Sequence, residues 1–123
     1  QIFAVKSKSV IYYLLKQYNN KQQDFDYFRH QQTNPHSISN NKVHAIFEDS
    51  KARLWIGTDG GLNEFNINQQ TFQRIQHNPT DTNSLSNNSV RAIHEDSKGS
   101  LWIGTFGGGL NKYNVETQRF QHF

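Results

Sequence analysis

A segment of eighteen residues occurs twice in this chain, and this internal repeat constrains the possible folds more than any other feature. Residues 41–58 read NKVHAIFEDSKARLWIGT, and residues 88–105, 47 positions later, read NSVRAIHEDSKGSLWIGT, so all but five positions are identical. The linkers that precede the two copies, 37–40 and 84–87, are also similar. A repeat of this length is typical of units that stack on one another, because a single unit cannot bury its hydrophobic face alone.

The first copy has the pattern of four short strands. Side chains at 43–47 alternate between apolar and polar, which is the period of a half-buried strand. Residues 54–58 are apolar on both faces, as in a strand buried between layers. Further strands are predicted at 62–66 and 71–75, before a polar loop at 76–88. Four strands joined by hairpins make one antiparallel sheet, and a radial array of such sheets is a β-propeller. The predicted fold class is therefore all-β, built of propeller blades.

Several residues that recur in both copies are interpreted as structural. The aspartates begin turns, the glycines allow tight hairpins, and the tryptophans lie in the strand that is apolar on both faces. Packing between blades is favoured for the tryptophans over stacking on a sugar ligand. The structural set is Asp49, Trp55, Gly57, Gly60, Gly61, Asp96, Trp102, Gly104, Gly107 and Gly108.

The longer motif resembles a known family. The run at 87–114 is similar to the two-component regulator propeller repeat, and residues 40–66 match it with Ala52 in place of the turn glycine and one glycine fewer. The resemblance implies an extracytoplasmic seven-bladed propeller on the periplasmic or extracellular side of a membrane-anchored receptor. It also implies that a histidine kinase or diguanylate cyclase output lies outside this segment.

On this interpretation the chain is a fragment of about 2.6 blades, since it has 123 residues and a 47-residue period. Residues 1–28 are expected to form a degenerate partial blade, 29–75 one blade and 76–123 another. The partners expected for such a fragment are the remaining blades of the receptor or further copies of itself. We therefore expect the chain not to be a stable monomer.

Composition and charge exclude several other functions. The net charge of +3 comes entirely from residues 1–30, and the remaining residues are neutral overall, so the chain lacks the basic cluster of a nucleic-acid-binding protein. The longest apolar run, at 10–15, is too short to insert into a membrane. The absence of cysteine excludes disulfides and thiol nucleophiles. No cofactor is expected.

Candidate ligand contacts are the positions where the two copies differ on the loop face of the propeller. In a propeller, the loops that enter the innermost strand and those that link the two middle strands share one face. The positions compared are His44 against Arg91, Lys42 against Ser89 and Asp59 against Phe106. The candidates taken from them are Lys42, His44, Asp59, Arg91 and Phe106, although drift on a solvated surface is the favoured interpretation of these differences.

No catalytic or metal site is predicted. The adjacent carboxylates 48–49 and 95–96 invite comparison with a glycosidase, but they recur in each copy and lead directly into a turn, so capping of turn amides is favoured. The histidines lack the spacing of a metal-binding helix.

The predicted function is a non-catalytic sensor segment that binds a ligand or a partner domain. The resemblance allows a glycan-type small ligand, although nothing in the sequence selects a sugar. Two alternatives remain open: a propeller hydrolase or lyase acting on polysaccharide, and a scaffold that recruits proteins through its loops.

Overall fold

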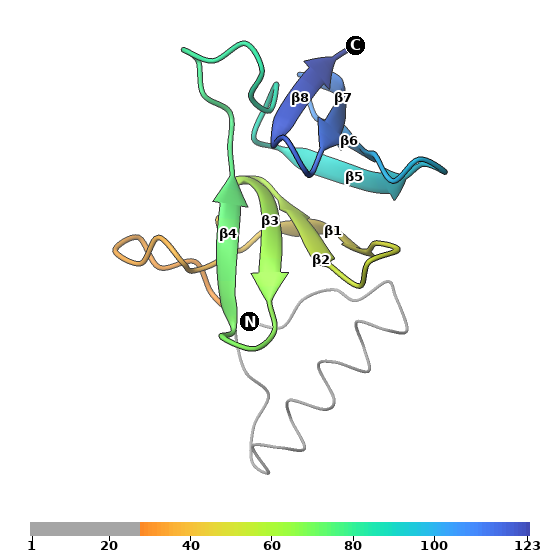
Figure 1. Cartoon of the computed structure of the whole chain (residues 1–123). Helices are drawn as coiled ribbons and strands as arrows, with labels where there is room; N and C mark the ends of the chain where they lie inside the picture. The colour runs from red at the N-terminus through yellow and green to blue at the C-terminus, as the bar shows by residue number, and fades with distance from the viewer. Residues whose placement is uncertain (1–27) are drawn as a thin grey trace.

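The computed structural model describes residues 28–123, which form two four-stranded antiparallel sheets (Figure 1). The first sheet, here called blade 1, contains β1 (Val43–Glu48), β2 (Leu54–Thr58), β3 (Gly61–Asn66) and β4 (Thr71–Ile75). The second sheet, blade 2, contains β5 (Val90–Glu95), β6 (Leu101–Thr105), β7 (Gly109–Asn114) and β8 (Arg119–His122). In both blades the strands are hydrogen-bonded in chain order. The all-β propeller-blade fold predicted from the repeat is confirmed.

The two blades have the same strand register. β1 pairs with β2 through Ile46 opposite Ile56, and β5 pairs with β6 through the equivalent residues Ile93 and Ile103. Each innermost strand contains a β-bulge, between Val43 and Ala45 in β1 and at the equivalent place in β5. A bulge adds an unpaired residue and re-aims its side chain. The bulged residues are His44 and Arg91.

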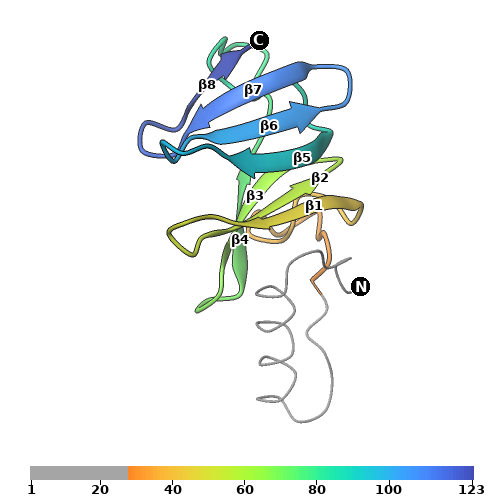
Figure 2. The same cartoon turned by 90° about the vertical axis from the view of Figure 1, so that its right-hand side faces the viewer.

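The blades stack face to face, with blade 2 lying over blade 1 (Figure 2). The contact between them is built around a hydrophobic cluster that draws from both sheets: Trp55 and Leu62 of blade 1 pack with Val90, Leu101, Ile103 and Tyr113 of blade 2. Trp55 is completely buried, and its ring meets Tyr113 edge-on at 6.0 Å between centroids. Blade 1 therefore buries one hydrophobic face against its neighbour, as expected for a stacked repeat.

Gly57 shows why a residue without a side chain is required at this contact. A Cβ atom built on Gly57 would lie 2.5 Å from Cγ1 of Val90, well inside van der Waals contact. The strands β2 and β5 approach so closely only because position 57 has no Cβ. The Trp-Ile-Gly-Thr sequence thus combines one large side chain with one absent side chain at the interface.

The linkers before each blade are less solvent-exposed than the predicted polar loop implies. Ile38 and Leu85, at equivalent positions, are 1% and 0% exposed. Ser39 donates its backbone N–H to Oδ1 of Asn63 in β3, and the Asn63 side chain donates back to Ser39 Oγ. Because the buried amide satisfies the linker backbone, the linker becomes part of the core.

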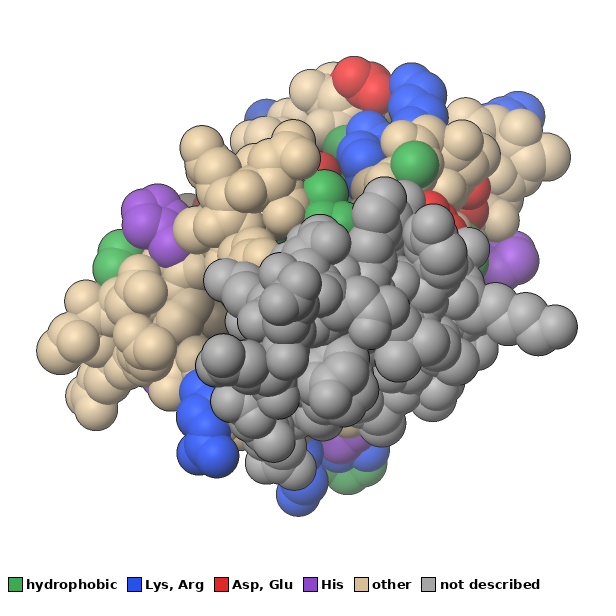
Figure 3. Space-filling view, turned by 90° about the horizontal axis from the view of Figure 1, so that it is seen from below, with side chains coloured by type: hydrophobic (Ala, Val, Ile, Leu, Met, Phe, Trp, Pro, Cys, Tyr) green, Lys and Arg blue, Asp and Glu red, His purple; other side chains and the backbone are tan. Residues whose placement is uncertain are grey.

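A second hydrophobic cluster lies on the other face of blade 1 and includes Ile46, Ile56, Phe65 and Phe72. Phe28, which precedes the linker, packs against this cluster. Phe28 packs edge-on against Phe65 and Phe72, with centroid distances of 5.1 and 5.6 Å. The degenerate blade expected at 1–28 otherwise falls on residues outside the described part of the chain. Viewed from below, the visible Lys and Arg side chains are distributed around the edge of the molecule (Figure 3).

Within residues 28–123, no helix has the length and apolar character needed to cross a membrane.

Candidate functional site

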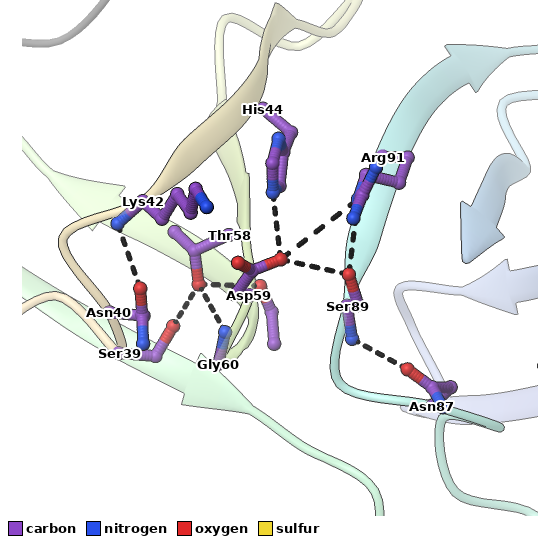
Figure 4. Close-up of polar contacts among 11 residues, drawn as sticks. Ser39, Asn40, Lys42, His44, Thr58, Asp59, Gly60, Asn87, Ser89 and Arg91 are labelled. Atoms are coloured by element: carbon purple, nitrogen blue, oxygen red, sulfur yellow. Dashed lines mark hydrogen bonds and ion pairs between the residues drawn. The ribbon is translucent and has the colours of Figure 1, made fainter. Parts of the chain in front are cut away.

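Asp59 lies at the centre of a polar cluster that joins the two blades. It occupies the turn between β2 and β3, and its Oδ1 atom is 2.7 Å from Nε2 of His44 in the same blade. The same oxygen accepts a 2.9 Å hydrogen bond from Ser89 Oγ and lies 3.9 Å from Nε of Arg91, both of which belong to the neighbouring repeat. Figure 4 shows the three side chains converging on the carboxylate.

Backbone hydrogen bonds fix the position of this cluster. Asp59 donates its backbone N–H to the carbonyl of Lys42 at 3.1 Å, which holds the β2–β3 turn beside the entry to β1. Phe106 donates to the carbonyl of Ser89 at 2.8 Å in the same way. The bulges then direct His44 and Arg91 toward these turns. Each blade therefore presents a bulge residue next to a turn residue on one edge.

Arg91 and Phe106 form the second half of the cluster. The Arg91 guanidinium lies over the Phe106 ring at 4.7 Å, within the range of a cation–π interaction. Its Nε atom donates to Ser89 Oγ at 3.1 Å. Phe106 is 66% exposed, which is unusual for a large apolar residue and leaves most of its ring in contact with solvent.

The electrostatics of the cluster keep Asp59 ionised. Hydrogen bonds from His44 and then Ser89 hold the pKa of the Asp59 carboxyl below its usual range, partial desolvation opposes them, and Coulombic interactions with His44 and Arg91 add to the lowering. The side chain of Asp59 is 30% exposed and that of Arg91 is 45% exposed. The cluster is therefore a solvated, charged rim and not a buried ion pair.

The structure brings all five ligand-contact candidates to one edge of the stacked blades. His44, Asp59, Arg91 and Phe106 are in direct contact as described above. Lys42 joins them through its backbone, and its side chain lies on the His44 side of the cluster in Figure 4. Whether these residues contact a ligand stays a prediction. Hereafter the group of Lys42, His44, Asp59, Ser89, Arg91 and Phe106 is called the rim cluster.

Ser89 belongs to one of the three residue pairs compared between the two copies, although Lys42 is the candidate chosen from that pair. It replaces Lys42 at the equivalent position, and its short hydroxyl bridges Asp59 to Arg91. The signal available was the charge change from lysine to serine at one repeat position. The role of Ser89 follows only from the structure, because Asp59 of the neighbouring blade lies beside it.

The structural aspartates cap their turns and also bind the tryptophans. Asp49 Oδ1 accepts backbone N–H bonds from Lys51 and Arg53, while Oδ2 accepts the Trp55 indole N–H at 2.9 Å. Burial raises the pKa of Asp49, but the hydrogen bond from Trp55 and those from Arg53 outweigh it, and the net pKa is lowered. Asp96 makes the same bond to Trp102, also at 2.9 Å. Both carboxylates are thus occupied as acceptors within their own hairpins.

Glu95 has a role between blades that the sequence did not indicate. Its two carboxylate oxygens accept the backbone N–H and the hydroxyl of Ser50, at 2.8 and 2.7 Å. The glutamate of blade 2 therefore caps the first hairpin of blade 1. The recurring Glu-Asp-Ser sequence contains both the acceptor and the donor of this contact, since each copy has one glutamate and one serine.

Of the remaining glycines in the structural set, Gly104 lies in β6 and the other four lie at the β2–β3 and β6–β7 hairpins. Gly61 and Gly107 have positive φ values of 128° and 91°, which L side chains rarely adopt. A Cβ on Gly60 would lie 2.6 Å from the carbonyl oxygen of Ser39, and one on Gly108 would lie 2.5 Å from Asn87 Cβ. Both tight contacts are with the linker, so these glycines let the linker pack on the hairpin.

Among the described residues, no three His, Asp or Glu side chains are grouped so as to hold a metal ion.

Comparison with known proteins gives a family for the repeat. The sequence model of the two component regulator propeller family matches residues 37–60 and 84–107, which confirms the resemblance seen in the sequence. These matches include the linkers, the innermost strands and the strands containing Trp55 and Trp102. No curated protein sequence matches the chain.

One solved structure with a TM-score above 0.5 has the same architecture. The chain is similar to the extracellular domain of a B. thetaiotaomicron protein described as the hybrid two component system BT3049, with 29% identity and a TM-score of 0.71. The match covers 81% of this chain but 14% of that one. A second match, to the extracellular domain of the B. thetaiotaomicron protein described as the hybrid two component system BT4673, has 17% identity and a TM-score of 0.37, and covers 79% of this chain and 20% of that one.

Proposed function

Because the chain carries two copies of the two component regulator propeller repeat, we propose that it is a non-catalytic segment of an extracytoplasmic sensor propeller. The observation that supports a sensing role is the rim cluster, in which residues of two blades meet at positions where the repeats differ. The resemblance to an extracellular domain of a hybrid two component system supports a location on the periplasmic or extracellular side.

The geometry suggests how binding at this edge is transmitted. Asp59 belongs to blade 1, whereas Ser89 and Arg91 belong to the repeat of blade 2, so a ligand that competes for any of them alters a contact between blades. An exposed cluster of this kind exchanges hydrogen bonds with a ligand at small cost, because its groups are already solvated. The ligand thereby acts on the relative position of the blades.

Two other functions remain as alternatives. A polysaccharide hydrolase or lyase needs a pair of carboxylates, or a His/Tyr pair, available to substrate. In the described residues Asp49 and Asp96 are engaged by their own hairpins and Glu95 by Ser50, which favours a structural role for them. A protein-recruiting scaffold uses the same edge, and exposed Phe106 suits such a contact.

The test is a glycan array combined with calorimetry on the full chain. Saturable binding without release of product is expected, and Asp59→Asn is expected to change the affinity at least threefold because it removes the charge on which His44, Ser89 and Arg91 converge. Asp81→Asn, in the exposed linker, is the matched control and leaves binding unchanged. Product release identifies the enzyme, and protein capture with silence toward small ligands identifies the scaffold; either result contradicts the proposal.

A further inference from the structure

Arg91 is held in one orientation by contacts that use only part of its guanidinium group. Nε donates to Ser89 Oγ at 3.1 Å, and the central carbon of the guanidinium lies over the Phe106 ring, 4.7 Å from its centroid. Within residues 28–123, the two terminal nitrogens of Arg91 make no hydrogen bond. Stacking and the Nε bond together remove much of the rotational freedom that a long side chain otherwise loses on binding.

The free edge of this guanidinium is a fork of N–H donors. The planar arrangement of these donors matches the two oxygens of a carboxylate, which an arginine binds through two parallel hydrogen bonds. Asp59 neutralises Arg91 only in part, because it lies 3.9 Å from Nε and shares its oxygen with His44 and Ser89. The group is therefore charged, oriented and still able to bind.

Phe106 adds the second recognition element. Its ring is 66% exposed and lies beneath the guanidinium, so a ligand that reaches the fork also passes over the uncovered part of the ring. Burying that ring with a flat nonpolar surface is favourable at about 25 cal/mol per Å² of apolar area removed from water. The equivalent positions in blade 1 are His44 and Asp59, so the blade 2 side of the rim cluster has this combination of fork and exposed ring and the blade 1 side does not.

We propose that Arg91 and Phe106 form a subsite for a carboxylate attached to a flat nonpolar face. This inference rests on the proposed function, since it assigns the chemical class of ligand bound by the rim cluster. Two sources carry that chemistry: an acidic sugar, whose C–H face covers the ring, and an aromatic acid. Lys42, on the far side of Asp59, adds positive charge to the same edge, which favours an anionic ligand over a neutral one.

The experiment compares matched charged and neutral probes on the full chain by saturation-transfer NMR titration. Benzoate is paired with benzamide, and glucuronate with glucose. The charged member of at least one pair is expected to bind at least tenfold more tightly than its neutral partner. Arg91→Gln is expected to abolish that preference, Arg91→Lys to retain only part of it, and Phe106→Ala to weaken the charged probe severalfold. Arg119→Gln, an exposed arginine on β8, is the control and keeps the preference.

The outcomes separate this inference from the proposed function. A preference for benzoate alone assigns the aromatic source, and a preference for glucuronate alone assigns the sugar. Equal binding of charged and neutral probes, or a preference that survives Arg91→Gln, overturns the carboxylate subsite. If neutral glycans still bind in the array and Asp59→Asn changes their affinity, the sensor proposal stands without the carboxylate subsite. Silence of every probe and of the array overturns both.

Discussion

Blade 1 and blade 2 carry nearly the same motif in very different surroundings. Trp55 is completely buried against blade 2, whereas the equivalent Trp102 is only partly buried and contacts Phe123 and Lys112. Leu62 is 0% exposed, and the equivalent Leu110 is 42% exposed. The same side chains are core in one blade and surface in the other. The motif therefore encodes a face to be covered, and burial depends on whether a neighbour is present.

The largest difference in stability between equivalent substitutions in the two blades is expected at the tryptophans. Trp55→Ala is expected to lower the free energy of unfolding by about 3–5 kcal/mol, the usual cost of deleting a large buried aromatic side chain. Trp102→Ala is expected to cost less than half as much, because its ring is already partly in water. Urea denaturation followed by circular dichroism measures both values. Equal losses would contradict the view that the neighbouring blade creates the difference.

Gly57 and Gly104 are a second pair of equivalent residues in different surroundings. Gly57→Ala is expected to destabilise the chain by about 1–3 kcal/mol, the range for overpacking, because its Cβ meets Val90 Cγ1 at 2.5 Å. At Gly104 the nearest atom to such a Cβ is Ala92 Cβ at 3.5 Å, an ordinary contact, so Gly104→Ala is expected to be nearly neutral.

A double-mutant cycle identifies the source of the Gly57 effect. Val90→Ala removes the atoms that clash, so the cost of Gly57→Ala measured in that background is expected to fall by at least half. Thermal unfolding of the four variants measures the coupling. Additive costs would show that the strain at Gly57 lies elsewhere.

The open face of blade 2, formed by Trp102, Leu110 and Phe123, is expected to drive association of the chain. Sedimentation velocity is expected to show concentration-dependent self-association, and Leu110→Lys is expected to weaken it about tenfold, or 1.4 kcal/mol. Thr117→Lys, in the exposed turn between β7 and β8, is the charge-matched control. A single sharp monomer peak at all concentrations, with cooperative unfolding, would contradict the expectation.

The first hairpins of the two blades differ at one turn position. Ala52 has φ of 62° where the equivalent Gly99 has φ of 85°, so the alanine adopts a left-handed conformation that costs an L residue about 1–2 kcal/mol. Gly99→Ala is expected to lower the free energy of unfolding by about 1 kcal/mol, and Ala52→Gly to raise it by somewhat less, because glycine loses more entropy on folding. Chemical denaturation measures both, and changes of the same sign would refute the explanation.

The smallest expected effect concerns Glu64, whose equivalent in blade 2 is Lys112. Desolvation raises the pKa of Glu64, outweighing the attraction of Arg53. Burial and the nearby Glu64 charge also raise the pKa of Tyr113, across the blade contact, to about 12. Because the folded state binds the Glu64 proton more tightly than the unfolded state, the resulting stabilisation is present below the ordinary pKa of 4.5 and is lost as pH rises through the folded pKa.

Glu64→Gln is therefore expected to raise the free energy of unfolding at pH 7 by about 0.5 kcal/mol and to leave it unchanged at pH 3. Denaturant titrations at the two pH values measure this. Gln121→Ala, at an uncharged and exposed position on β8, serves as the control, since its effect should be the same at both pH values. A Glu64→Gln effect independent of pH would show that side-chain shape, and not charge, matters there.

Prediction from the sequence succeeds where the information lies within one repeat. The strand at 43–47 follows from alternation and the buried strand at 54–58 from apolar character on both faces, and the structure places β1 and β2 there. The sequence predicts a polar loop at 76–88, yet Leu85 within it is buried, as is the equivalent Ile38 of the first linker. Their burial depends on Asn63 and Asn111, more than twenty residues away, and no local pattern reveals such a pairing.

The rim cluster illustrates the same division. Its candidate members were found because they differ between equivalent positions, which is a property of the sequence alone. Their actual partners were not predictable, since Asp59 of blade 1 meets Ser89 and Arg91 of the neighbouring repeat. The contact from Glu95 to Ser50 was missed for the same reason.

The sequence by itself determined the unit of this protein: a 47-residue repeat whose hydrophobic period and turn residues specify a four-stranded blade. The pairing within a hairpin and the alternation of side chains along a strand depend on residues close together in the sequence, so both can be predicted from it. The tertiary structure decided which copy of each residue is core and which is surface, and which charges meet at the rim. Those outcomes depend on the distance between two sheets, because burial and electrostatic attraction arise only when the blades are stacked.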